Sequence, residues 1–471
     1  MEDNAKVARA TLWYTISNIL LRGVSLITAP IFTRMLSTSD YGIASNFTSW
    51  VNIILCFTTL SLPTAALRGR IGYKEKYKNF LSSVQTLGML WTGFCCIVMF
   101  FSLDWLSDFM QLDKACIIVM LFYLLVYPSL LYAQVDFRFD YKYKENVAIS
   151  VINTIGTVSC SMGLILLWSN QRYLGRIVGT VLPTIIMGTW FAVKIYRQGS
   201  CFIDIDYWKY ALKLSLPMIP HSLAMIILGQ IDRIMIIRYC GNSQAGIYSF
   251  GYSYAVLISV VTNALNDAVQ PQMYEMLENN ESKKLASLSY KMIMLGVMVS
   301  VILIGVGPEA LKILGTDDYF EARWMIFPVL MGTLMQYIYQ FFGVIEIYCE
   351  KTAYMAIGSC GAAIVNYILN MLLIPRMGYV IAAYTTLISY GLLMLFHFIM
   401  SRMAYKKEVF RIMPILLITV ISLAIGMVLM RLYDSSWLAR YGVLLLVVSV
   451  FYVALRREIA ELIKIVVSKG K

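Results

Sequence analysis

Long apolar runs are the feature that most limits what this chain can fold into. Runs of 18 or more mostly apolar residues recur along nearly all of its 471 residues. Each run is long enough to cross the hydrocarbon core of a bilayer as an α-helix. The chain is 59% hydrophobic and only 14% charged, whereas soluble domains are about a quarter charged. The sequence therefore predicts an all-α polytopic membrane protein.

We expect about 14 transmembrane helices, since the runs separate at polar turns. Their ranges are roughly 11–35, 42–67, 79–103, 115–135, 146–168, 173–196, 213–238, 245–270, 287–311, 322–348, 352–374, 378–401, 412–431 and 438–455.

The positive charges predict an orientation. About two thirds of the 39 Lys and Arg residues lie before the first span, in even-numbered connections or after the last span, and about a quarter lie in odd-numbered connections. Cytoplasmic loops carry such an excess, so both termini are expected in the cytoplasm. The same loops account for the net charge of +12, and we expect no nucleic acid as a partner.

A repeat divides the chain. Arg34 is followed eight residues later by Gly42-Ile43, and Arg238 is followed eight residues later by Gly246-Ile247, an offset of 204 residues (238 − 34). The same offset carries the third to sixth spans onto the ninth to twelfth within a few residues. Six helices per unit makes the repeats parallel. We expect an N-lobe over 1–205, a C-lobe over 206–405 and an unmatched C-terminal helix pair over 406–471.

Arg22 is the most deeply placed charge of the first span. It lies ~16 Å from either end at the rise of an α-helix, too far for easy snorkelling. An arginine at the bilayer centre costs at least ~2.5–3.5 kcal/mol. Arg22 is therefore expected to face water, a partner or an anionic ligand, and the alternative is an anchor bonded to carbonyl groups of another helix.

Three further charges lie in or beside the seventh span. Asp232 and Arg233 are adjacent, so they point about 100° apart and each needs a partner elsewhere. A polar cavity could supply those partners, but Arg233 could also snorkel to the interface. Arg238 and its repeat equivalent Arg34 lie at the outer ends of their helices, where interfacial anchoring competes with substrate binding.

Four polar residues are candidates for a coupling-ion site or a polar cavity. Asp267 and Glu346 lie near the inner ends of their spans, and either could bind a cation or a proton. Asp267 could equally bond arginines of the neighbouring loop. Asn366 and Asn370, at positions i and i+4, share one helix face. Hydrogen bonds between helices are the default interpretation of such a pair.

Catalytic residues, metal sites and cofactors are not expected. The chain has two histidines and nine cysteines, without the spacing of a zinc site. It lacks a nucleotide-binding motif. Uphill transport would therefore need a proton or sodium gradient, or the concentration difference of the substrate itself.

The chain resembles the Wzx-type polysaccharide (O-antigen) flippases of the multidrug/oligosaccharidyl-lipid/polysaccharide (MOP) exporter superfamily. The resemblance rests on the plan of six, six and two helices. It also rests on short motifs at 29–37 (APIFTRMLS), 40–42 (DYG), 216–220 (LPMIP), 231–233 (IDR) and 245–248 (AGIY).

The resemblance implies two six-helix lobes, MATE-like and V-shaped, that rock around a cationic cavity in the bacterial inner membrane. Similar proteins move an undecaprenyl-pyrophosphate-linked oligosaccharide, such as an O-antigen unit, from the cytoplasmic to the outer leaflet. Arg22 matches a first-helix arginine of the peptidoglycan-precursor flippase, and Arg233 falls in the seventh-helix signature. The last two helices would hold the polyprenyl tail. Membrane lipid is then a partner, and a polysaccharide polymerase is an open one.

Two other functions remain open. A multidrug or cation antiporter of the same superfamily would usually have twelve helices, with carboxylates deep in its first lobe; Arg22 argues against it. A non-transporting membrane assembly partner would need neither a buried Arg22 nor duplicated lobes.

Overall fold

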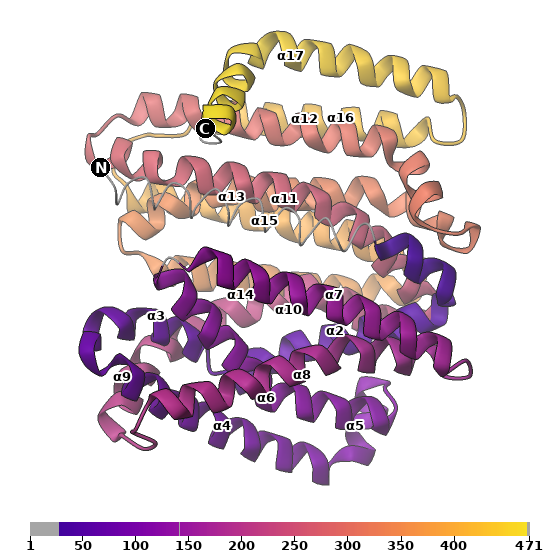
Figure 1. Cartoon of the computed structure of the whole chain (residues 1–471). Helices are drawn as coiled ribbons and strands as arrows, with labels where there is room; N and C mark the ends of the chain where they lie inside the picture. The colour runs from indigo at the N-terminus through magenta and orange to yellow at the C-terminus, as the bar shows by residue number, and fades with distance from the viewer. Residues whose placement is uncertain (1–27, 141, 469–471) are drawn as a thin grey trace. The chain divides into compact units, whose positions relative to one another are not determined.

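The structure is a computed structural model that describes residues 28–140 and 142–468. Every regular element in these ranges is helical (Figure 1). A helical stretch over 28–35 precedes α2 (Thr38–Thr58), α3 (Leu62–Tyr73), η1 (Lys74–Lys76), α4 (Tyr77–Phe101), α5 (Leu103–Met110), α6 (Lys114–Phe139), α7 (Tyr143–Leu167), α8 (Arg172–Gln198), α9 (Ile205–Ser215), η2 (Leu216–Met218), α10 (Ile219–Cys240), α11 (Asn242–Glu278), α12 (Ser282–Leu314), η3 (Asp317–Ala322), α13 (Arg323–Tyr348), α14 (Thr352–Met377), α15 (Ile381–Ala404), α16 (Ile412–Arg431) and α17 (Trp437–Ser468).

The prediction of an all-α, multi-pass membrane protein is confirmed. Among the described residues, 11 helical stretches are long and apolar enough to cross a membrane. They overlap the third to thirteenth expected spans, and 437–453 of α17 is a shorter apolar helix at the fourteenth. The first expected span lies largely outside the described residues, so the total of fourteen stays a prediction.

The second expected span, 42–67, is interrupted. Leu60 and Ser61 have φ of 49° and 52°, in the left-handed region, so α2 ends before them and α3 begins after them. Pro63 lies in the first turn of α3, where a missing N–H costs no hydrogen bond. The apolar pattern alone did not indicate this break.

Residues 35–246 of the described chain form one compact unit. In it α8 packs against α6 and α7, α4 packs on α6, α3 on α9, and α2 on α10. Buried apolar side chains from α2, α5, α6 and α8 form one core cluster, which includes Phe47, Leu106, Ile117, Met120 and Ile177.

Residues 28–34 and 247–468 belong to the second compact unit. Here α15 packs against α13 and α14, and α12 packs against α13, α16 and α17 (Figure 1). In the stretch Asp317–Tyr348, which ends with α13, 89% of the most apolar window is buried. These units group helices by contact and not by repeat, so the expected lobes 1–205 and 206–405 and the pair 406–471 stay predictions.

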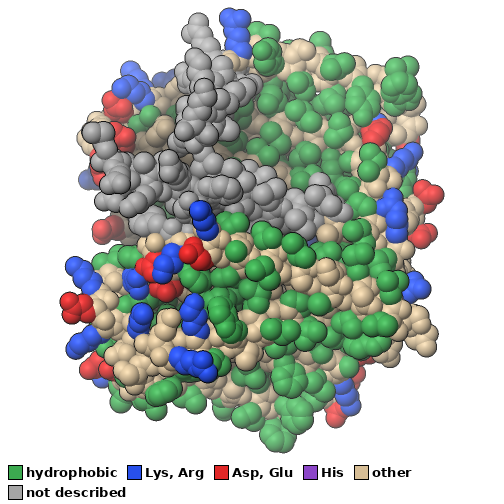
Figure 2. All heavy atoms as spheres, in the orientation of Figure 1, with side chains coloured by type: hydrophobic (Ala, Val, Ile, Leu, Met, Phe, Trp, Pro, Cys, Tyr) green, Lys and Arg blue, Asp and Glu red, His purple; other side chains and the backbone are tan. Residues whose placement is uncertain are grey.

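The surface of the first unit suits a lipid environment. Large apolar side chains are exposed along its helices, among them Trp91 and Phe94 on α4, Ile155 on α7 and Ile186 and Trp190 on α8. Figure 2 shows hydrophobic side chains spread over this unit and charged ones gathered at the side where α3 and α9 lie. Such a distribution would be a liability in water and is normal against acyl chains.

The two copies of the repeat signature contact each other reciprocally. A Cβ at Gly42 would lie 1.9 Å from the carbonyl oxygen of Asn242, and a Cβ at Gly246 would lie 1.9 Å from that of Thr38. Thr38 and Asn242 are themselves 204 residues apart (242 − 38). The hydroxyls of Thr38 and Ser243 are 2.6 Å apart. Equivalent residues therefore face each other as a local two-fold axis would place them.

Gly42→Ala and Gly246→Ala should each destabilise the protein, because a methyl group cannot fit 1.9 Å from a carbonyl oxygen and the helices must separate. We expect a loss of about 1–3 kcal/mol or more, the usual range for overpacking. Thermal unfolding in detergent measures it. Gly93→Ala is the matched control, since nothing lies within 4 Å of its Cβ position. An unfolding temperature for Gly42→Ala equal to that of the control would contradict the close crossing.

Arg440 fastens α17 to α12. It lies in the first turn of α17 and is 1% exposed. Its guanidinium pairs with the carboxylate of Glu309 on α12 and lies 5.6 Å from the ring of Tyr433. The Tyr433 hydroxyl donates to the carbonyl of Ile304, at 2.8 Å, and burial raises the pKa of Tyr433. A cation near a helix N-terminus is unfavourable, and Glu309 offsets that cost.

Arg440→Met should loosen the docking of α17. The variant leaves Glu309 without its cation, and because that carboxylate is 42% exposed water recovers part of the loss. We expect a destabilisation of about 1–3 kcal/mol, below the usual value for a fully buried pair. Thermal unfolding measures it, with Arg431→Met at the exposed end of α16 as the control. Equal changes in unfolding temperature for the two substitutions would show that the Arg440–Glu309 pair does not stabilise the docking of α17.

Candidate functional site

Asp232 and Arg233 lie on a buried face of α10. Their exposed fractions are 2% and 9%, so Arg233 does not reach a free surface as the snorkelling alternative requires. Its Nη1 donates to the carbonyl of Gly229 at 2.8 Å and to Oε1 of Gln230 at 3.0 Å. The same Gln230 oxygen accepts from the hydroxyl of Ser49 on α2, at 3.0 Å. The side-chain amide of Gln230 thus connects the Arg233 guanidinium to α2.

Arg34 and Arg238 are exposed. Arg34 donates to the carbonyl of Pro30 at 2.8 Å and to that of Ile313 at 3.4 Å. Arg238 lies in the last turn of α10, before Gly241 ends the helix with φ of 95°. Cations at helix C-termini are stabilised by the helix dipole. Both positions fit the anchoring alternative.

Arg22 lies outside the described residues. Its expected place in a cationic cavity stays a prediction.

Glu346 has a partner that the sequence analysis missed. The carboxylate on α13 is fully buried, and Nδ1 of His397 on α15 lies 2.9 Å from Oε1 and 3.0 Å from Oε2. The two residues are 51 positions apart, and no spacing rule links them.

Asn366 and Asn370 join α14 to α15. Nδ2 of Asn370 donates to Oδ1 of Asn366 at 3.2 Å, and Nδ2 of Asn366 donates to the hydroxyl of Thr386 at 3.0 Å. The hydroxyl of Thr385 donates to Asn370. All four residues are buried. These bonds match polar contacts between helices. Asp267, the remaining ion-site candidate, is exposed on α11.

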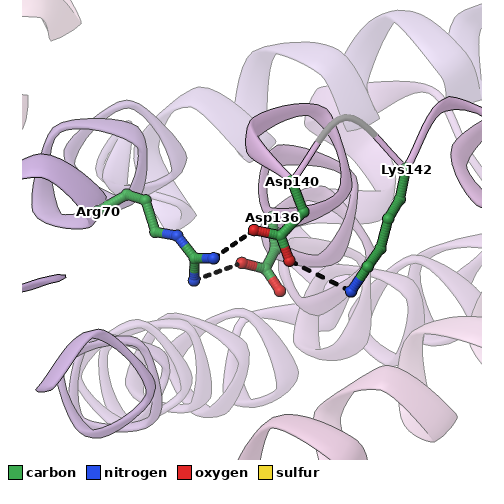
Figure 3. A network of polar contacts seen from close by, with 4 residues as sticks. All are labelled: Arg70, Asp136, Asp140 and Lys142. Carbon is green, nitrogen blue, oxygen red and sulfur yellow. Dashed lines mark hydrogen bonds and ion pairs between the residues drawn. The ribbon is translucent and has the colours of Figure 1, made fainter. Parts of the chain in front are cut away.

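A second charge network, at the end of α6, was also missed. Figure 3 shows Arg70 of α3 pointing at Asp136 and Asp140, with Lys142 on the far side of Asp140. Nη1 of Arg70 lies 3.2 Å from Asp136, Nη2 pairs with Asp140, and Lys142 lies 3.2 Å from Asp140. The Arg70 guanidinium also lies 4.6 Å from the Tyr77 ring. Arg70 and Lys142 had been counted only as loop charges, because sequence does not show which loop cations meet carboxylates.

Comparison with known families gives a match over residues 7–277, to the family described as polysaccharide biosynthesis protein. The match covers more than half of the chain. This chain belongs to the polysaccharide biosynthesis protein family.

Two relatives of this polysaccharide biosynthesis protein come from Haemophilus influenzae. A protein of the Lsg locus is 22% identical over 286 residues, which cover 59% of this chain and 68% of the relative. A membrane protein described as uncharacterized is 23% identical over 288 residues, covering 57% and 66%. The chain spans about two thirds of the length of both relatives.

Solved structures show the fold. The lipid II flippase MurJ in an inward closed conformation matches with a TM-score of 0.69 and 16% identity, over 96% of this chain and 99% of that one. An inward-facing MATE family transporter of the MOP superfamily matches with 0.57 and 13%, over 84% and 94%. At 16% and 13% identity these matches show that the chain shares its fold with a flippase and with a transporter of the MOP superfamily.

Arg233→Gln should lower the amount of surface polysaccharide in cells that depend on this protein. The variant removes one buried cation, and a charge-assisted hydrogen bond contributes about 1.5–3 kcal/mol, so we expect a fall of at least about tenfold. Arg238→Gln, five residues along the same helix and exposed, should change it by less than about twofold. Surface polysaccharide is measured per amount of protein in the membrane. Equal losses of surface polysaccharide in the two variants would contradict a role of Arg233 beyond that of the exposed Arg238.

Proposed function

We propose that this protein is a flippase that moves a lipid-linked oligosaccharide, the repeat unit of a surface polysaccharide, from the cytoplasmic to the outer leaflet by alternating access. The lipid carrier is undecaprenyl pyrophosphate. The protein works in the inner membrane of a bacterium with both termini in the cytoplasm, as its loop charges predict.

The extent of the structural match carries the proposal. The lipid II flippase covers 96% of this chain, whereas two MATE transporters cover 84% and 85%. The unmatched share is about 15%, close to the 66 residues of the expected pair 406–471 among 471. We infer that the residues unmatched in the MATE transporters are this helix pair and that the pair is shared with the lipid II flippase, which favours a flippase over a drug or cation antiporter.

The chemistry of the candidate cavity supports the same cargo. A pyrophosphate carries about two negative charges, and arginine binds phosphate oxygens in a bidentate way. We assign Arg22 and the buried Arg233 to the pyrophosphate. We assign the exposed Arg34 and Arg238 to anchoring of helix ends. Asp232 lies next to Arg233 and is a polar neighbour of the cargo path.

The second part of the proposal concerns the ion that couples to transport. A proton or sodium gradient could drive the cycle. Of the residues first considered, we keep Glu346 as a site for a coupling ion and assign Asn366 and Asn370 to contacts between helices. Asp267 is exposed, and for it we favour the alternative, a bond to arginines of the neighbouring loop.

Purified protein in liposomes should expose an undecaprenyl-pyrophosphate-linked oligosaccharide to a glycosidase that cannot cross the membrane. We expect cleavage to rise well above the half already exposed in the outer leaflet, and Arg22→Ala to return it to the protein-free level. Efflux of ethidium instead of flipping would favour the antiporter. If the protein shows neither flipping nor efflux, and a strain carrying Arg22→Ala makes normal amounts of surface polysaccharide, the result would favour the non-transporting assembly partner.

A further inference from the structure

The buried pair of Glu346 and His397 joins the two helices that form the centre of the second unit. α13 and α15 run side by side there (Figure 1). The side chains of Glu346 and His397 are 0% and 1% exposed. Nδ1 of the imidazole lies almost equally far from both carboxylate oxygens, at 2.9 and 3.0 Å. Neither side chain faces lipid, and neither residue lies in a loop.

The surroundings of the pair are apolar and tight. The ring of Tyr339 stacks on the imidazole with centroids 5.1 Å apart, and that of Phe396 meets it edge-on at 5.5 Å. On the other side is α14, where a Cβ at Gly358 would lie 2.9 Å from Nε2. Within the described structure Nε2 has no hydrogen-bond partner. A static structural pair would be expected to satisfy this nitrogen.

Few other charges face the pair from the adjoining helices. Apart from Glu346 and His397, the charged residues of α13 to α16 all lie in first or last turns, namely Arg323, Arg376, Arg402 and Arg431. The turn between α13 and α14 adds Glu350 and Lys351, and α12 carries Lys283, Lys284, Lys291, Glu309 and Lys312. The remaining ionisable groups on these elements are phenols and thiols such as Tyr339. Arg402 already pairs with Glu408 at 3.0 Å.

The number of protons on such a pair sets its net charge. With one proton shared between the carboxylate and Nδ1 the pair is neutral overall. Loss of that proton to water leaves one buried negative charge, and gain of a second leaves one buried positive charge. Burying an uncompensated charge is costly. Water that reaches the pair in one conformation of the transport cycle lowers this cost there. The conformations then differ in their affinity for protons.

We propose that Glu346 and His397 form a proton-binding site whose occupancy sets the rate of the transport cycle. The inference rests on the proposed flippase function for its consequence but not for the site itself. Its ligand is a proton taken from water, and imidazole is the side chain whose titration falls nearest to neutral pH.

The site can be tested without any cargo. The chain has two histidines, so in a His221→Asn background labelled at the imidazole carbons the NMR signal reports His397 alone. We expect the signal to change with pH, and Glu346→Gln to alter that response because the nearest charged partner of the imidazole is lost. A signal that is constant from about pH 5 to 9 overturns the proposal, and so does the same response in both proteins.

Transport then tests the consequence. In liposomes at equal pH on both sides, flipping should vary at least about threefold between about pH 6 and 8. The double variant Glu346→Gln/His397→Gln, which can keep a neutral hydrogen bond, should flatten that profile. Glu350→Gln, at an exposed site four residues on, should keep the wild-type profile.

The two proposals fail in different ways. If the imidazole titrates and no flipping occurs at any pH, the proposed function is wrong and the proton site stands. If flipping occurs with the same pH profile in the double variant as in the wild type, the role of the site in transport is wrong and the flippase stands.

Discussion

The reciprocal crossing of Gly42 and Gly246 is the contact on which the geometry of the first unit depends. A helix crossing at this distance is possible only where neither chain has a side chain, because each glycine lies against the carbonyl that precedes the other by four residues. The crossing brings α10 against α2, and Ser49 can then reach Gln230. Arg233 donates to that amide, so the position of a candidate cargo-binding cation depends on the crossing at Gly42 and Gly246.

Burial of charge explains the other polar contacts. A charge inside a membrane protein needs a partner or water. Arg440 and Glu309 form a pair that fixes one helix on another, and the exposed carboxylate sits at the edge of the protein. Glu346 and His397 have no such access to solvent, and one of them titrates near neutral pH in water. Guanidinium does not lose its proton under these conditions. The first pair is therefore suited to docking, and the second can respond to pH.

Features that depend on local composition, such as the positions of the helices, could be predicted from the sequence. Apolar runs located the helices, since backbone groups in a bilayer must bond within their own segment. The offset of 204 residues identified Gly42 and Gly246 as equivalent, but not that they touch. The partner of Glu346 could not be predicted, because 51 residues of helix and turn can place His397 on any face. The pairing of Arg440 with Glu309 could not be predicted either, since hydropathy shows where a helix begins and not what covers its first turn.

Electrostatics of the cargo bear on what the proton does. An inner membrane is negative inside, so a pyrophosphate with about two negative charges moves outward in a favourable direction, by about 2.3 kcal/mol per charge for each 100 mV. In the proposed cycle the loaded step then needs no proton gradient. The empty flippase would carry the proposed pyrophosphate-binding arginines back toward the cytoplasm, and a proton on the Glu346–His397 pair would add to the charge that moves. Under this proposal the pair regulates the return step, so flipping would continue without a gradient yet change its rate with pH.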